Sequence, residues 1–177
     1  MATRRDAGSE LKFAVDLVNR IVEGIDGIRT GVHICRGNWS KQDSVHLSGD
    51  YEPLVPSLSK INVQQLVLEF ATPRAGDFGI VGRNLNNREI GLGVASPKTE
   101  EVESVEYIVG KVEKALEHYQ PENIFLNPDC GFGTFSGCSI TTHEAASAKM
   151  KRIVEAAKLL RERYAGRAER KVGEAAA

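Results

Sequence analysis

The feature that most constrains the fold of this chain is a regular alternation between short apolar runs and segments with helical periodicity. The apolar runs rarely alternate in polarity, and they lie at residues 28–35, 65–70, 89–95 and 123–127. Strands of this kind are typical of parallel sheets that are covered by helices. Four such units predict an α/β fold of parallel βα units, either a small open sheet or half of a TIM (β/α)8 barrel, which typically needs about 250 residues.

Helical patterns occupy residues 11–25, 53–61, 99–119 and the chain from 141 onward, and a brief helix or irregular connection leads to residue 85. Ser9 is the expected N-cap of the first helix, and Thr99 of the helix over 99–119. Thr141 and Glu144 form a capping box before the last helix. We expect one domain over residues 1–164, and a tail over 165–177 that frays.

Two of these helices have a clear apolar stripe at helical spacing. In the first helix the residues expected to face the core are Leu11, Val15, Val18, Ile21, Val22 and Ile25. In the last helix they are Met150, Ile153, Val154, Ala157 and Leu160.

Composition excludes several functional classes. The chain has 177 residues, of which 41% are apolar and 27% charged, as expected for a soluble globular protein. A net charge of -1 gives no electrostatic case for binding nucleic acid or an anionic membrane. The apolar runs are too short to span a bilayer, and the N-terminal residues lack the apolar segment of a secretory signal. Three cysteines, an odd number, favour a cytoplasmic protein with free thiols over a disulfide scaffold.

Polar residues with metal-binding side chains follow the carboxyl ends of three predicted strands. His33 and Cys35 are two apart, so they point to the same side of a strand. Glu69 is the last residue but one of the second strand, and Cys130 follows the fourth. Function in parallel α/β folds gathers at these strand ends. Two sulfurs, one nitrogen and one carboxylate oxygen form a tetrahedral ligand set that suits zinc.

Each of these residues also has a structural interpretation. A His and a Cys on a strand are often core residues, Cys130 could be a small buried side chain, and Glu69 could pair with Arg74. A carboxylate inside such an apolar run is nevertheless costly to bury without a cation. Cys138 has no partner at ligand spacing, so we interpret it as structural. The other histidines, which we expect to be solvated or to cap helices, are His46, His118 and His143.

The motifs around these residues resemble a known family. They are His33-Ile-Cys35, Val-Leu-Glu69, Ile90-Gly-Leu-Gly-Val94 and Asn127-Pro-Asp-Cys130-Gly, in that order. Together they resemble the C-terminal catalytic domain of the cobalamin-independent methionine synthases, over residues 11–164. The resemblance implies a (β/α)8 barrel in which the matching residues, His33, Cys35, Glu69 and Cys130, bind a catalytic zinc.

The resemblance also implies a reaction. In the family, a zinc-bound thiolate attacks an alkyl donor, and the best-known case is methyl transfer from 5-methyltetrahydrofolate to homocysteine. The physical chemistry agrees, since a thiol with a pKa near 8.5 is mostly protonated at neutral pH and coordination to zinc deprotonates it. We therefore expect an enzyme that uses zinc, a small-molecule thiol and an alkyl donor.

Two departures from the family pattern bear on this expectation. The match covers only the second half of the family's barrel, so we expect a homo-oligomer or a companion half-barrel chain. The family's Asp-Ile-His-Ser-Pro segment is replaced by Ala95-Ser-Pro-Lys98-Thr, which places Lys98 where the proton-handling histidine would be. Lys98 is a candidate catalytic residue, as a cationic contact or a different acid, or it is a solvated loop lysine.

Some segments resemble a side branch of the family that includes epoxyalkane:coenzyme M transferase, in which a zinc-activated thiol opens an epoxide. These segments are residues 35–39, 48–51 and 73–76. The resemblance makes Arg36 and Arg74 candidates for binding an anionic substrate tail, and the alternative is a surface or intra-loop salt bridge. Three functions remain open: methyl transfer to homocysteine, another zinc-dependent thiol alkylation such as epoxide opening, and a non-catalytic zinc-binding half-barrel module.

Overall fold

One parallel sheet positions all the candidate residues. The computed structural model describes residues 6–38, 40–42, 45–135 and 137–174, and at positions 134, 135, 138 and beyond 164 it describes the backbone alone. The sheet has the order β1-β2-β3-β4, with every neighbouring pair parallel. Its strands are β1 (Gly31–Ile34), β2 (Gln65–Leu68), β3 (Glu89–Ala95) and β4 (Ile124–Pro128). The predicted parallel α/β architecture is confirmed.

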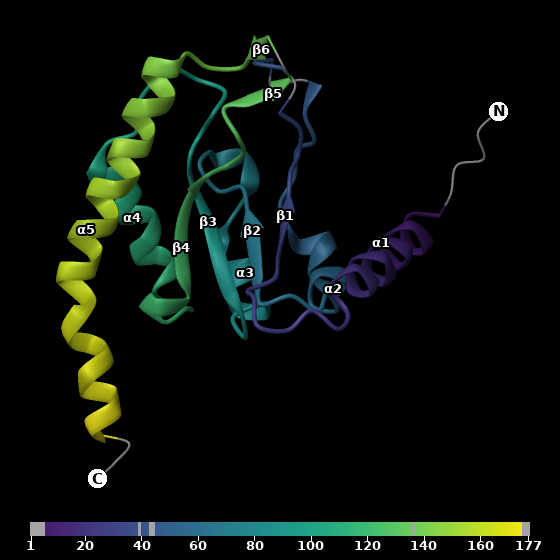
Figure 1. Ribbon diagram of the computed structural model, residues 1–177, viewed down its shortest axis with the longest axis horizontal. Helices are drawn as coiled ribbons and strands as arrows, with labels where there is room; N and C mark the ends of the chain where they lie inside the picture. The colour runs from purple at the N-terminus through teal and green to yellow at the C-terminus, as the bar shows by residue number, and fades with distance from the viewer. Residues whose placement is uncertain (1–5, 39, 43–44, 136, 175–177) are drawn as a thin grey trace.

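Helices connect the strands and flank the sheet. The α-helices are α1 (Ala7–Val22), α2 (Val55–Leu58), α3 (Phe78–Asn84), α4 (Val105–Ala115) and α5 (His143–Glu174). Short 3-10 turns lie at η2 (Glu52–Leu54), η3 (Pro73–Ala75) and η4 (Pro121–Asn123). Helices α4 and α5 pack together beside β4, while α1 and α2 lie on the β1 side (Figure 1). A small antiparallel hairpin, β5 (Gly133–Phe135) with β6 (Cys138–Ser139), lies past the carboxyl end of β4.

Three predicted helix N-caps were wrong, and the first two are those of α1 and α5. The N-cap of α1 is Asp6, whose carboxylate accepts from the backbone N–H of Ser9. At α5, the hydroxyl of Thr142 accepts from the N–H of Ala145, so the helix starts one residue later than the capping box predicts. Helix α5 continues past Tyr164, and the fraying predicted for the tail stays a prediction.

The largest difference concerns Thr99, because α4 does not begin there but at Val105, where Ser104 is the cap. The reason lies in tertiary contacts of the preceding loop. Glu103 accepts a hydrogen bond from the N–H of Ser96 at 2.8 Å and pairs with Lys149 of α5 at 2.9 Å. Lys149 is fully buried and also donates to the carbonyl of Glu101. This ion pair fixes the loop after β3 in a non-helical conformation.

The core lies where β2 and β3 meet the helices. Side chains with at most 1% exposure include Leu66, Leu68, Ile90 and Leu92 from these two strands. Strand β3 is buried along almost its whole length, which agrees with its continuous apolar sequence. The edge strands β1 and β4 are only partly covered.

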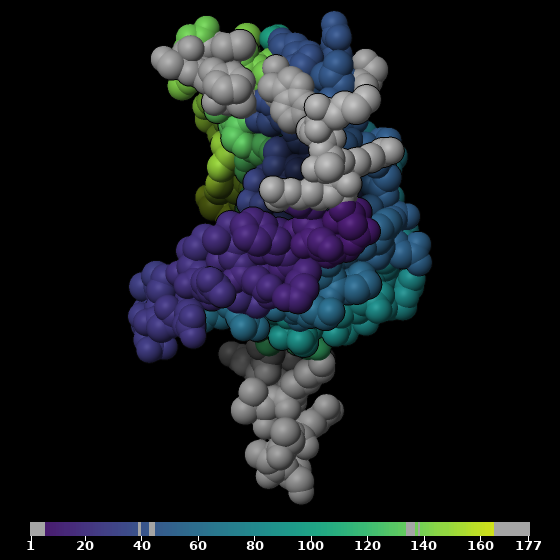
Figure 2. Space-filling view, turned by 90° about the vertical axis from the view of Figure 1, so that its right-hand side faces the viewer, coloured from purple at the N-terminus to yellow at the C-terminus, as the bar shows by residue number. Residues whose placement is uncertain are grey.

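Two apolar surfaces remain open at the two edges of the sheet. On α1, Val15 is buried, but Ile21, which we expected in the core, is 64% exposed. Ile25, expected there too, lies beyond the end of the helix and is 42% exposed. Ile21 forms a second stripe with Phe13 and Leu17 on the exposed side of α1, the helix that lies across the face shown in Figure 2.

At the other edge, an open apolar groove of about 680 Å³ runs between α4, α5 and β4. Met150 and Val154, two residues that we expected in the core, line it and are 43% and 48% exposed, whereas Ile153 and Leu160 are buried as expected. Exposed apolar surfaces of this kind mark contacts with another protein, a membrane or a ligand. Among the described residues, no helix combines the length and the apolarity that crossing a membrane requires.

Candidate metal centre

Four side chains from three strand ends converge at the carboxyl edge of the sheet. They are His33, Cys35, Glu69 and Cys130, and one donor atom from each lies within 4.8 Å of all the others. Cys130 is at the middle of the cluster. Its Sγ lies 3.1 Å from Cys35 Sγ and 3.4 Å from His33 Nε2, and it donates to Glu69 Oε1 at 3.0 Å. The expectation that these four residues meet is confirmed, although they are up to 97 residues apart in the sequence.

Parallel pairing of the strands accounts for this convergence. His33 is within β1, and Cys35 follows its last residue. Glu69 comes directly after β2, and Cys130 follows β4. Because all four strands run in the same direction, their carboxyl ends meet at one edge. The central strand β3 contributes none of the four residues.

The hydrogen bonds of His33 define its tautomer. Its Nδ1 lies 3.0 Å from the carbonyl oxygen of Val67. A carbonyl can only accept, so Nδ1 carries a proton, and in the neutral imidazole Nε2 keeps the lone pair that faces Cys130 Sγ. Metal-binding histidines typically donate their other ring N–H to an acceptor of this kind, which fixes the ring and increases ligand basicity.

The electrostatics of the cluster favour a cation. Glu69 and Cys130 are buried, at 3% and 9% exposure, whereas His33 and Cys35 are exposed on the edge-strand side. Burial, followed by the hydrogen bond with the Glu69 carboxylate, raises the pKa of the Cys130 thiol. The N–H of Gly37 donates to Cys35 Sγ at 3.2 Å. A bound cation would offset the cost of burying a carboxylate beside two sulfurs.

The spacing and chemistry of the donors fit zinc. With Zn–S bonds of about 2.3 Å, the two sulfurs of a tetrahedral site lie about 3.8 Å apart. The observed donor separations are of this order, and small side-chain rotations would adjust them. Two thiolates, an imidazole and a carboxylate also select a borderline-soft metal over calcium or magnesium.

The predicted substrate-binding arginines are packed near this cluster. Arg36 is 7% exposed, its guanidinium stacks 4.3 Å from the ring centre of Tyr51, and it donates to the carbonyl of Arg74 at 2.9 Å. Arg36 therefore holds two loops together, which sequence reasoning missed. Arg74 lies in the 3-10 turn after β2, and binding of an anionic tail by either arginine stays a prediction.

Lys98, the predicted catalytic residue, lies in the loop after β3. It is partly buried, and its backbone N–H donates to Ser96 Oγ at 3.3 Å. Strand β3 ends at Ala95, so Lys98 is on the same edge of the sheet as the four-residue cluster. Its catalytic role stays a prediction.

None of the remaining histidines belongs to the cluster within the described part of the chain. His46 is buried at 7% exposure, so the prediction that it is solvated was wrong. The side chain of Cys138, predicted to be structural, and all of Trp39 lie outside the described residues.

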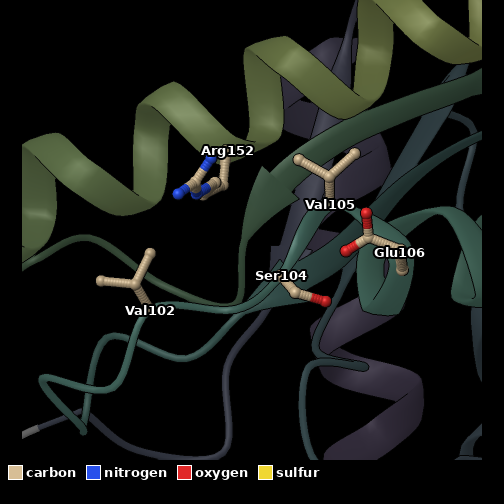
Figure 3. Close-up of a pocket in the computed structure, with 5 residues that line it drawn as sticks. All are labelled: Val102, Ser104, Val105, Glu106 and Arg152. Carbon is tan, nitrogen blue, oxygen red and sulfur yellow. The ribbon is translucent and has the colours of Figure 1, made fainter.

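A separate shallow depression lies between the start of α4 and α5 and is lined by Val102, Ser104, Val105, Glu106 and Arg152 (Figure 3).

Two buried residues next to the cluster were also missed. Tyr51 is 1% exposed, and its hydroxyl accepts from the backbone N–H of Glu69 at 2.9 Å. Burial raises the pKa of Tyr51 to about 12, so its hydroxyl stays protonated. Asp129 is 8% exposed, and burial raises the pKa of this carboxyl to about 7, although hydrogen bonds from Ala71 and Phe70 lower it. The only sequence signal for Asp129 was its position beside Cys130.

The fold and the cluster define a class of protein: a parallel α/β chain with a thiolate-rich candidate metal site at the carboxyl edge of its sheet. Residues 30–159 match the model of the family described as "Cobalamin-independent synthase, Catalytic domain". The chain belongs to this family. All four cluster residues fall within the matched range.

Individual relatives agree with this assignment. The chain is 33% identical to a methionine synthase of Pyrococcus horikoshii over 86% of its own length and 39% of the relative. It is 37% identical to a methionine synthase of Pyrococcus furiosus over 70% of its length and 32% of the relative. The chain thus spans about two fifths or less of these curated relatives.

Among solved structures, a B12-independent methionine synthase from Shewanella sp. W3-18-1 superposes with a TM-score of 0.72 at 19% identity. The superposition covers 88% of this chain and 45% of that one. A putative B12-independent methionine synthase from Listeria monocytogenes gives a TM-score of 0.61 at 21% identity. The fold therefore corresponds to about half of a TIM barrel, as predicted.

Proposed function

We propose that His33, Cys35, Glu69 and Cys130 bind zinc, and that the site serves a thiol alkyltransferase. The observation that carries this proposal is the convergence of the four donor atoms within 4.8 Å, with Nε2 of His33 left available by its Nδ1 hydrogen bond. Zinc, when bound, would deprotonate a substrate thiol and leave a nucleophilic sulfur. Membership of the cobalamin-independent synthase family supports methyl transfer to homocysteine as the reaction.

The residues of this chain have distinct roles in the proposal. Tyr51 orients Glu69 through the Glu69 N–H, and Val67 orients the imidazole of His33 through its carbonyl. Exposure of His33 and Cys35 leaves room on the β1 side for a substrate to approach. Lys98 would contribute a cationic contact or a proton at the same edge, and Arg36 or Arg74 would attract an anionic tail.

Thiol binding tests this function. We expect the cobalt-substituted protein to change its visible absorption when homocysteine is added, because a new sulfur enters the coordination sphere. If a sulfonated thiol binds to this site better than homocysteine does, the result would favour the epoxide-opening branch. A spectrum that neither thiol changes would favour a non-catalytic zinc-binding module, because structural zinc sites are closed.

We also propose that a second copy of this chain covers the two open edges. A two-fold axis along the barrel would place β4 of each copy beside β1 of the other, and all eight strands would run parallel. Two-fold dimers are the commonest oligomers, and the net charge of -1 opposes association little.

Mass in solution tests this second proposal. We expect light scattering to give a particle of two chains, and we expect Phe13→Glu to shift it toward one chain because Phe13 is 61% exposed on α1. Lys12→Gln, at the neighbouring exposed position, is the matched control and should leave the mass unchanged. A wild-type chain that stays monomeric at high concentration would contradict self-association and indicate a separate companion half-barrel.

A further inference from the structure

The chain segment that follows β2 is held in place by side chains from other parts of the fold. Strand β2 ends at Leu68, so the backbone groups of Glu69, Phe70 and Ala71 lie beyond the sheet ladder. The hydroxyl of Tyr51 accepts from the N–H of Glu69. The carbonyl of Phe70 accepts from Lys111 at 2.6 Å, and that of Ala71 accepts from Tyr107 at 2.7 Å.

One carboxylate holds the two remaining N–H groups of this segment. Asp129 Oδ1 accepts from Phe70 N at 2.9 Å and from Ala71 N at 2.8 Å. The backbone N–H of Asp129 is itself fixed, because it donates to the carbonyl of Ala95 at 2.8 Å. Asp129 therefore connects the chain after β4 with the chain after β2.

This connection has to pass over β3, which lies between the two strands. Gly93 of β3 makes the passage possible. A Cβ atom at Gly93 would lie 2.1 Å from Asp129 Oδ1, 2.8 Å from the carbonyl oxygen of Leu68 and 3.0 Å from the nitrogen of Phe70. Any side chain at this position would displace the carboxylate from the two N–H groups that it binds.

Both ends of this bridge are bonded neighbours of proposed zinc ligands. Glu69 precedes Phe70, and Cys130 follows Asp129. The two ligands are also in direct contact, since Cys130 Sγ lies 3.0 Å from Glu69 Oε1. We infer that Asp129 is a positioning residue that sets the separation of Glu69 and Cys130 across β3, and that Gly93 is required for it to do so. This inference rests on the proposed zinc function.

Zinc competition with a chromogenic chelator tests the inference on the purified full chain. We expect Asp129→Ala to weaken zinc binding by about tenfold to a hundredfold, the usual effect of removing a group that orients a ligand. Asp129→Asn keeps an acceptor oxygen and should lose less. Gly93→Ala should lose at least as much as Asp129→Ala, because its Cβ also crowds the Leu68 carbonyl and the Phe70 nitrogen. Adding Gly93→Ala to Asp129→Ala should cost less than Gly93→Ala costs in the wild type, because the contact with the carboxylate is already lost.

Gly91→Ala is the matched control on the same strand. Its Cβ would lie 2.9 Å from Asn127 Oδ1 and 2.9 Å from Val67 Cγ2, so it crowds the sheet without reaching Asp129. We expect wild-type zinc affinity in this variant. A loss equal to that of Gly93→Ala would attribute the effect to sheet strain and overturn the inference. Wild-type zinc affinity in both Asp129→Ala and Gly93→Ala would also overturn the inference. If Asp129→Ala does not fold, wild-type affinity in both Asp129→Asn and Gly93→Ala would overturn it instead.

Hydrogen exchange provides a readout that does not depend on metal. In the metal-free protein, Asp129→Ala should speed exchange at the amides of Phe70 and Ala71 at least about tenfold, while amides in β3 keep wild-type rates. Unchanged exchange at both amides overturns the inference. A wild-type protein that binds no zinc would contradict the proposed function, and the exchange rates would still decide the role of Asp129.

Discussion

Cys130→Ser is expected to abolish tight zinc binding. Cys130 lies at the centre of the cluster, in contact with the donor atoms of all three partners. Four-ligand zinc sites in small domains bind with about 10–16 kcal/mol, so the loss of one ligand should weaken binding at least about a hundredfold. Isothermal titration of the metal-free protein with zinc under reducing conditions measures the change.

The same measurement on two further variants makes the result specific. Cys35→Ser should lose a comparable factor, because it removes the other sulfur. Cys138→Ser removes the third cysteine and should keep near-wild-type affinity, as expected for a residue that is not a ligand. If Cys138→Ser lost as much affinity as Cys130→Ser, the cluster would not be the zinc site.

Lys149→Ala is expected to give the largest loss of stability. Lys149 is fully buried on α5, and its ammonium pairs with Glu103, which in turn accepts from the N–H of Ser96. Removing one partner of a buried pair leaves the other without compensation, at a cost of roughly 3–5 kcal/mol in the free energy of unfolding. Urea denaturation monitored by circular dichroism measures this free energy.

Two comparisons separate the ion pair from a general effect on α5. Lys151→Ala, an exposed position of the same helix, should change the free energy of unfolding by at most about 0.5 kcal/mol. In a Glu103→Gln background, Lys149→Ala should cost clearly less, because no carboxylate is left unpaired. Equal costs in both backgrounds would show that Lys149 stabilises the protein without the ion pair, through packing and its hydrogen bond to the Glu101 carbonyl.

The sequence was sufficient to predict the sheet and the cluster. Four apolar runs separated by helical patterns imply parallel pairing, and parallel pairing alone brings Glu69 and Cys130 to the same edge as His33. No knowledge of side-chain packing was needed for this step. The bounds of β3 were predicted correctly, because after Glu89 the strand is continuously apolar and it is central in the sheet.

The largest error arose because a local signal was overruled by distant contacts, and the others have separate causes. Thr99 is a good cap, but Glu103 pairs with a lysine of α5 and keeps the loop out of the helix. The outer stripe of α1 is apolar without being core, because it faces the open edge of a half-barrel. The Asp129 bridge depends on space above Gly93, which no local pattern reveals.

X-ray absorption at the zinc edge tests the central claim most directly. We expect one zinc per chain, with two sulfur ligands at about 2.3 Å and lighter nitrogen and oxygen ligands near 2.0–2.2 Å. Addition of homocysteine should raise the sulfur count from two to three. A coordination shell without sulfur would contradict the assignment of Cys35 and Cys130 as ligands, and two sulfurs that stay two in saturating thiol would contradict thiol activation at this site.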